Sequence, residues 1–279
     1  SIYTYSHCYC HCHFLFPSQI AFYDNRCQNE SMNNFLSEIL ELKQQRVELA
    51  KSNNNFESLK NHSFSVRSRA TSHALRKQLQ ADNEIHIIAE IKRASPSKGI
   101  INDKIDVAET AQAYQRGGAT AISVLTEEDR FGGSLSDLKL ARKAVKIPIL
   151  RKDFVFDEFQ IYEAAAAGAD AILLIVAMLE DKKLFQLKRL IEDELKLDAL
   201  VEVHTLEELE RAKAIKANII GVNNRDLHSF NVSLDVSREL IKHAPQDALM
   251  IAESGLQTRE DLLELKQLGF KGFLIGEAL

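Results

Sequence analysis

Residues 87–99 read IIAEIKRASPSKG, an apolar run followed by an acid, an amine and a polar loop. Side chains alternate between the two faces of a strand, so Glu90 and Lys92 would share one face with Ile88. A parallel strand with a purely structural role would be apolar on both faces. The acid and the amine therefore indicate either a functional site or solvated charges at a surface strand end, and this stretch alone favours neither interpretation.

The loop SPSKG, residues 95–99, adds two small hydroxyl side chains, with two cations nearby. Hydroxyl groups and cations donate hydrogen bonds to anionic oxygens. The composition of this loop suits a phosphate or carboxylate ligand, and Ser95 is a candidate substrate-binding residue.

Outward from this strand, short apolar runs alternate with segments of helical periodicity. We predict strands near residues 85–91, 119–125, 147–151, 170–176, 198–203, 218–222, 248–252 and 270–275. We predict helices near residues 107–117, 135–145, 156–167, 180–194, 205–216, 235–243 and 258–267. This α/β pattern indicates a (β/α)₈ TIM barrel, which typically has ~250 residues. A doubly wound open sheet is the rival fold, but no GxGxxG motif follows the first strand.

An N-terminal helical extension precedes the predicted barrel. Apolar residues recur at helical spacing from Phe35 to Leu49, and a polar loop follows at residues 52–55. A second short helix is predicted over residues 70–80.

Residues 1–31 differ from the rest of the chain, because they are rich in Tyr, His, Cys and Phe and sustain no amphipathic period. We expect them to be a disordered extension outside the domain, which would start at Met32 and cover residues 32–279. The run CYCHCH at residues 8–13 lacks the ligand spacing of known zinc sites, so we predict no metal site there.

The sequence stops just after the eighth predicted strand. We expect a C-terminally truncated barrel without its eighth helix. Phe273 and Ile275 share one face of the last strand and Leu274 lies on the other, and one of these sets of apolar side chains would then be exposed.

The composition excludes several classes of protein. The chain has 279 residues, of which 45% are hydrophobic and 27% charged, as in ordinary soluble domains. A net charge of -5 argues against a general nucleic-acid binder. No apolar run reaches the ~18–20 residues that span a membrane. The four cysteines all lie at or before Cys27, which fits a reducing compartment.

In a barrel of this kind the active site lies at the carboxyl ends of the strands. Two carboxylates, two lysines and an amide occupy the ends of four predicted strands: Glu90, Lys92, Lys152, Glu202 and Asn223. Each one alone could be a solvated group, but their convergence favours a catalytic site. His204 is predicted to be a satisfied wall residue. Arg151 and Asp153 have a simpler interpretation as helix caps. No His/Asp/Glu trio has the spacing of metal ligands, so we predict no metal.

The last two predicted strands end in small residues. Ser254 and Gly255 follow the seventh strand, and Gly276 and Glu277 follow the eighth. This is the usual phosphate position in such barrels. Glycines let backbone N–H groups approach an anion, and a helix N-terminus favours it. We therefore predict a phosphorylated substrate.

Taken together, these motifs closely resemble the indole-3-glycerol phosphate synthase family. The matching strings cover nearly all of residues 32–279 and are FLSEIL, IAEIKRASPSKG, AISVLTEEDRFGGS, PILRKDF, LVEVH, IGVNNRDL, IAESG and FLIGEAL. The resemblance implies a carbon–carbon lyase (carboxy-lyase) of tryptophan biosynthesis. Its substrate would be 1-(2-carboxyphenylamino)-1-deoxyribulose 5-phosphate, and the ring would close with loss of CO₂ and water. A cytoplasmic enzyme without a cofactor is implied, in possible association or fusion with other enzymes of the pathway.

The resemblance also implies catalytic roles. Lys152 resembles the general acid that protonates the substrate carbonyl or hydroxyl. Glu202 resembles the acidic partner that stabilises or deprotonates the anilinium-like intermediate. Glu90 and Asn223 resemble groups that bind the ribulose hydroxyls and orient the lysines. Lys92 resembles the lysine that binds the carboxylate and serves in dehydration.

The remaining roles implied by the resemblance concern binding. Arg225 resembles part of the polar network, and Phe131 and Phe154 would form part of the anthranilate pocket. The four residues that end the last two strands match the phosphate site. Independently, ring attack on a carbonyl needs a proton donor near neutral pH. The pKa of a free lysine is about 10.4, so we expect burial or a second cation such as Lys92 to assist Lys152.

Two alternatives remain. Phosphoribosylanthranilate isomerase is also a phosphate-binding barrel, but its reaction requires a Cys or Asp acid/base pair rather than two lysines. The predicted barrel has no cysteine, which argues against this alternative. A non-catalytic barrel kept for binding would predict lost site residues.

Overall fold

The computed structural model of the chain describes residues 17–81, 84–227 and 229–276. The barrel strands are β1 His86–Ile91, β4 Ala121–Leu125, β5 Ile149–Lys152, β6 Ala171–Ile175, β7 Asp198–Val203, β8 Ile219–Asn223, β9 Leu249–Glu253 and β10 Gly272–Ile275. The α-helices are α1 Pro17–Asn53, α2 Phe56–Arg67, α3 Ala74–Leu79, α4 Val107–Arg116, α5 Leu135–Ala144, α6 Glu158–Ala167, α7 Asp181–Arg189, α8 Leu206–Ala214, α9 Asp235–Leu240 and α10 Arg259–Leu268. Short 3-10 or π turns occupy Val176–Met178, Leu190–Glu194 and Ile241–His243.

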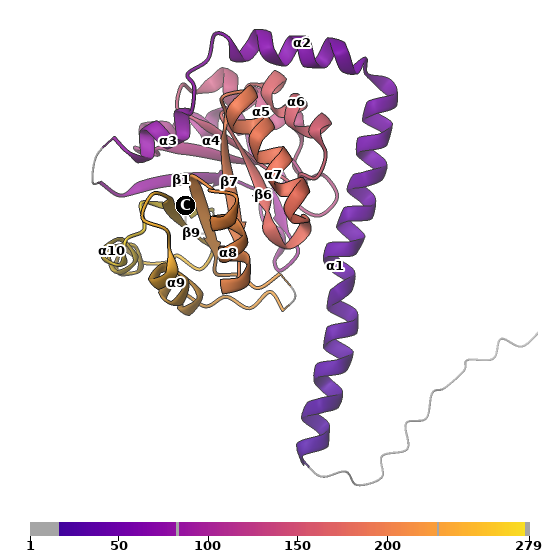
Figure 1. The fold of residues 1–279 in the computed structure, drawn as a ribbon, viewed down its shortest axis with the longest axis vertical. Coiled ribbons are helices and arrows are strands. Elements are labelled where there is room, and N and C mark those ends of the chain that lie inside the picture. The colour runs from indigo at the N-terminus through magenta and orange to yellow at the C-terminus, as the bar shows by residue number, and fades with distance from the viewer. Residues whose placement is uncertain (1–16, 82–83, 228, 277–279) are drawn as a thin grey trace, which may run out of the picture.

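The eight barrel strands are parallel and close in the order β1-β10-β9-β8-β7-β6-β5-β4. Closure is made by β10 against β1, where Ile275 pairs with Ala89. A helix follows each of the first seven strands, and these helices surround the barrel (Figure 1). The predicted (β/α)₈ barrel is therefore confirmed, and every site residue at a strand end faces the same rim.

Side-chain alternation divides the apolar residues into two layers. Inward residues of the strands, such as Ile88, Leu150 and Leu274, form one cluster inside the barrel, and outward residues such as Ile122 pack against the helices in a second cluster. Phe273 belongs to this outer cluster and is 0% exposed. Leu274 on the other face is also buried, so the expectation that one set of these side chains would be exposed is wrong for both Phe273 and Leu274.

Helices from the N-terminal extension close both ends of the barrel interior. Leu75 and Leu79 of α3 belong to the inner cluster, and a Cβ on Gly272, the first residue of β10, would lie 3.0 Å from Leu79. Ile39 of α1 joins the same cluster. The following turn of α1 reaches the opposite end, since Lys43 pairs with Asp153 just beyond β5. The barrel core is therefore completed by residues that precede the first strand.

The extension differs from the predicted helices in two places. Helix α1 begins at Pro17, before the helical pattern predicted from Phe35, and it projects beyond the barrel (Figure 1). Pro17 occupies the first helical position, and no glycine or proline interrupts the helix after it. Residues 1–16, with the CYCHCH run, lie outside the described residues.

The second difference is α2, which the sequence did not predict. Asn55 caps α2 by accepting a hydrogen bond from the N–H of Ser58. The helix packs on α6 through a few large contacts, such as that between Phe56 and Tyr162, whose ring centroids are 5.5 Å apart. Its apolar stripe is therefore too sparse to give a clear period. None of the helices among the described residues has both the length and the apolar character to cross a membrane.

Candidate active site

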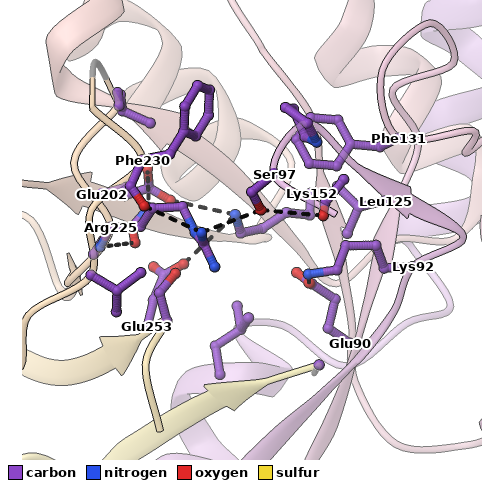
Figure 2. A pocket seen from close by; sticks show the side chains of 18 of the residues that line it. Glu90, Lys92, Ser97, Leu125, Phe131, Lys152, Glu202, Arg225, Phe230 and Glu253 are labelled. Carbon is purple, nitrogen blue, oxygen red and sulfur yellow. Dashed lines mark hydrogen bonds and ion pairs between the residues drawn. The ribbon is translucent and has the colours of Figure 1, made fainter. Parts of the chain in front are cut away.

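A cavity of about 340 Å³ opens at the carboxyl ends of the strands. Its lining includes every catalytic candidate predicted from the sequence: Glu90, Lys92, Lys152, Glu202 and Asn223. It also includes the predicted binding residues Ser95, Phe131, Phe154, Arg225, Ser254, Gly255 and Gly276. Glu277 lies outside the described residues. The barrel thus gathers into one cavity side chains that are far apart in the sequence (Figure 2).

Lys152 lies between two buried carboxylates. Its Nζ is 3.5 Å from Oε2 of Glu202 and 3.7 Å from Oε2 of Glu253. Burial alone would lower the pKa of Lys152, but the negative charges of Glu202, Glu253 and Glu90 outweigh it and raise this pKa. Burial acts in the expected direction, but these carboxylates dominate the electrostatics around Lys152, so the net shift of its pKa is opposite to the expected one.

Glu202 and Glu253 have opposite protonation tendencies. Burial would raise the pKa of Glu202, but Lys152 and His204 outweigh that effect and lower it. Burial and the charge of Glu202 together raise the pKa of Glu253 to about 8. Two carboxylates with separated pKa values can serve as a base and an acid in the same site.

Glu253 was not singled out as a catalytic candidate from the sequence. Because strand residues alternate, Glu253 faces inward with Ile251 of the inner cluster. Gly221 of β8 provides the space, since a Cβ at this position would overlap Oε1 of Glu253. The same alternation argument that selected Glu90 could have found Glu253.

His204 and Asn223 hold Glu202 from its other side. Nε2 of His204 is 3.3 Å from Oε1 of Glu202, and Nδ2 of Asn223 donates a 3.2 Å hydrogen bond to the same oxygen. Nδ1 of His204 is 3.1 Å from Glu208. Although burial opposes it, hydrogen bonding to the two glutamates raises the pKa of His204 to about 10. His204 thus lies between Glu202 and Glu208 and adds a positive charge next to Glu202.

Glu90 and Lys92 form the opposite wall. Nζ of Lys92 is 3.0 Å from Oε1 of Glu90. Figure 2 shows the two side chains next to each other in the cavity. A Cβ on Gly276 would lie 2.9 Å from the same Oε1, so glycine leaves space for this carboxylate. The two charges at the end of β1 therefore belong to the cavity and not to a solvated strand end.

The loop after β1 closes one side of the cavity. The polar loop predicted at residues 95–99 forms part of a short hairpin, in which β2 Ala94–Ser95 pairs with β3 Gly99–Ile100. Nη1 of Arg225 lies 3.4 Å from Oγ of Ser97. The backbone N–H of Arg225 donates a 3.0 Å hydrogen bond to Oδ1 of Asn223. Through these two contacts, Arg225 links Ser97 of the hairpin to Asn223 at the end of β8.

The predicted phosphate end has a distinctive backbone. Ser254 and Gly255 have φ values of 62° and 76°, so two left-handed residues follow β9 in succession. The side-chain amide of Asn224 donates to the carbonyls of Glu253 and Ser254, at 3.0 and 3.2 Å, and fixes this turn. A turn of this type presents backbone N–H groups to an anion. Asn224 was not predicted from the sequence, because its role depends on the neighbouring strand.

An apolar wall completes the cavity. Phe131 and Phe154 have ring centroids 6.2 Å apart, and Phe35 of α1 meets Phe230 edge-on at 5.2 Å. All four rings line the cavity. Phe35 and Phe230 were not predicted to line the site, since neither ends a barrel strand.

The sequence suggested that Arg151 and Asp153 are helix caps. In the structure they instead form a buried ion pair with each other. Nη2 of Arg151 is 3.0 Å from Oδ2 of Asp153, and both residues are buried. Thr126 donates to the same oxygen at 2.6 Å. Among the residues that the structure describes, no group of three or more His, Cys, Asp or Glu side chains is arranged to hold a metal ion.

Comparisons with known proteins agree with this geometry. A family model described as indole-3-glycerol phosphate synthase matches residues 36–279. A relative of that name from Carboxydothermus hydrogenoformans is 44% identical over 251 residues, which cover 88% of this chain and 94% of the relative. One from Legionella pneumophila is 43% identical, covering 89% and 94%. One from Dehalococcoides mccartyi is 51% identical over 199 residues, covering 70% and 76%.

Solved structures support the fold alone. N-acetylmannosamine-6-phosphate 2-epimerase from Clostridium perfringens has a TM-score of 0.56 and 16% identity, covering 75% of this chain and 92% of its own. Thiamine phosphate pyrophosphorylase from Pyrococcus furiosus has a TM-score of 0.51 and 18% identity, covering 73% and 88%.

Proposed function

The chain belongs to the indole-3-glycerol phosphate synthase family, and on that premise we propose how its cavity carries out the reaction. Its function is indole-3-glycerol phosphate synthesis in the tryptophan pathway, on a small phosphorylated substrate. The proposed reaction class is that of a carboxy-lyase. The ring carbon that bears the carboxylate of 1-(2-carboxyphenylamino)-1-deoxyribulose 5-phosphate bonds to the ribulose carbonyl carbon, and CO₂ and then water leave.

The observation that carries the proposal is the position of Lys152 between Glu202 and Glu253 in the cavity. As the carbon–carbon bond forms, the carbonyl oxygen gains negative charge and becomes basic enough to take a proton from an ammonium group. The raised pKa keeps Lys152 protonated before attack. A positioned general acid of this kind is typically worth roughly 10²–10⁴-fold.

The carboxylates divide the remaining proton chemistry. The lowered pKa of Glu202 keeps it ionised, so it can stabilise the cationic ring intermediate and accept its proton. Glu253, with a pKa of about 8, carries a proton at neutral pH and can assist departure of the hydroxyl as water. Lys92 is proposed to bind the substrate carboxylate and to serve in dehydration.

The rest of the cavity positions the substrate. Glu90 and Asn223 would bind the ribulose hydroxyls, and Arg225 and Ser95 would extend this polar network. The aromatic rings of Phe131 and Phe154 would hold the anthranilate ring. The two left-handed residues after β9, together with Gly276, would bind the phosphate. Four points remain predictions. They are the phosphate-binding role of Glu277, a cytoplasmic location, independence from a cofactor, and association or fusion with other tryptophan-pathway enzymes.

The proposal is tested by incubating the purified chain with the carboxyphenylamino-deoxyribulose phosphate and following indole fluorescence and CO₂ release together. Equal amounts of indole product and CO₂ are expected. Indole product without stoichiometric CO₂ would contradict the proposed reaction class. Absence of product from a folded chain would contradict the proposed assignment of the cavity.

A further inference from the structure

Lys43 lies outside the barrel, on helix α1, yet its ammonium group is buried. Nζ is 2.9 Å from Oδ1 of Asp153, and the two side chains are only 5% and 0% exposed. A lysine on an added helix could be satisfied by water or by a surface acid. Here it is inserted into the barrel wall at the end of β5, next to the proposed general acid.

Asp153 occupies the position between two cavity residues, Lys152 and Phe154. All three residues line the cavity, and the carboxylate of Asp153 is held by Lys43, Thr126 and Arg151. Oδ1 also accepts a hydrogen bond from the N–H of Phe154 at 2.9 Å. Whatever holds this carboxylate therefore holds the backbone that carries both cavity side chains.

The same network fixes the backbone of Lys152. Oδ2 of Asp153 accepts from Oγ1 of Thr126 at 2.6 Å and from Arg151 at 3.0 Å. The N–H of Thr126 donates to the carbonyl of Lys152 at 3.1 Å. Burial opposes ionisation of Asp153, but Lys43 and Arg151 outweigh it and lower the pKa of Asp153. Asp153 thus carries a charge that Lys43 and Arg151 both stabilise.

We infer that Lys43 is a positioning residue for ring closure, which acts through Asp153 to hold Lys152 in register with Glu202 and Glu253. The inference rests on the proposed role of Lys152. Without the ammonium group, Asp153 keeps Arg151 as its nearest cation and would move toward it. A shift of about 1 Å at the reacting groups can cost about 10²-fold in rate.

Helix α1 supplies a matched control. Nζ of Lys51 is 2.8 Å from Oδ2 of Asp157, so this second lysine also joins the helix to the loop after β5. That pair is more exposed, at 35% and 21%, and neither residue lines the cavity. Lys51→Met removes the same charge from the same helix without touching the residues that flank Lys152.

The experiment compares Lys43→Met, Lys43→Arg and Lys51→Met in the full chain. We expect Lys43→Met to lower kcat by about tenfold or more, at a temperature where circular dichroism shows a folded protein. Lys43→Arg should recover part of the loss, because it restores the charge with a different geometry. Lys51→Met should keep the kcat of the wild type.

A second comparison separates positioning from general stability. If Lys43 acts through Lys152, adding Lys43→Met to Lys152→Ala should lower kcat no further, because the two changes remove one function. Independent, multiplicative losses would overturn the inference, as would a wild-type kcat in folded Lys43→Met. If Lys43→Met does not fold, Lys43→Gln decides, because it keeps a polar side chain beside Asp153 but removes the charge: a wild-type kcat there overturns the inference. A wild type that makes no indole product would instead contradict the proposed function itself.

Discussion

Gly221 of β8 faces Glu253 of β9, and the carboxylate of Glu253 occupies the space that a side chain on Gly221 would need. The two residues lie 32 positions apart in the sequence and meet only because β8 and β9 are neighbours in the barrel. The glycine therefore provides room for a buried acid in the cavity.

Gly221→Ala is expected to displace Glu253 and to crowd Leu200, whose Cδ1 would lie 3.2 Å from the new methyl group. Overpacking of this kind typically costs about 1–3 kcal/mol. We expect a lower urea midpoint together with a lower kcat. Gly117→Ala is the control, because its φ is −73° and the methyl group would meet nothing closer than 3.4 Å.

Lys152→Ala is expected to reduce kcat by roughly 10²–10⁴-fold through loss of the general acid. The fold should persist, and Glu202 should lose one of the two cations, Lys152 and His204, that keep it ionised. Steady-state fluorescence assays measure the loss of kcat, and circular dichroism shows whether the fold persists. Retention of more than half of the kcat would exclude the assignment.

Glu202→Gln keeps the size of the side chain and removes its charge. We expect kcat to fall more than KM changes, because the interaction is made with charge that develops during the reaction. Glu210→Gln, in an exposed pair with Lys213, is the surface control. A change in KM alone would assign Glu202 to binding instead of catalysis.

Glu253→Gln should change how stability depends on pH. The pKa of Glu253 is raised from 4.5 to about 8, so between these values the folded state holds a proton that the unfolded state has released. The wild type should therefore lose stability relative to the variant as pH rises through this window, by at most about 1.4 kcal/mol per pH unit. Urea midpoints from pH 5 to 8 measure the difference; parallel curves would show that Glu253 is ionised.

Arg67→Met should destabilise the barrel without changing catalysis at its opposite end. The buried guanidinium of Arg67 pairs with Asp170 and donates to the carbonyls of Leu195, Ala169, Thr71 and Lys196. Breaking such a buried pair typically costs about 3–5 kcal/mol. Arg238→Met removes an exposed pair with Glu264 and should cost much less, because solvent screens exposed ion pairs. A large drop in kcat for folded Arg67→Met would contradict this separation.

Local sequence was sufficient for the barrel itself and for the residues at its strand ends. The order of strands and helices can be predicted from the period and length of the apolar runs alone. Alternation within one strand placed Glu90 and Lys92 on the face of Ile88, and the cavity contains both. Ser254 and Gly255 also followed from their place at the end of a strand, and the structure gives both the left-handed backbone of a tight turn.

Only the tertiary structure decided which groups touch. The neighbours of Lys152 are carboxylates from β7 and β9, and their combined charge reversed the expected direction of its pKa shift. The sequence around Lys43 gives no indication of its partner, because only the folded barrel brings Asp153 next to α1. A sequence pattern reports the face on which a residue lies, whereas pKa values and buried ion pairs depend on distances of a few ångströms between separate elements.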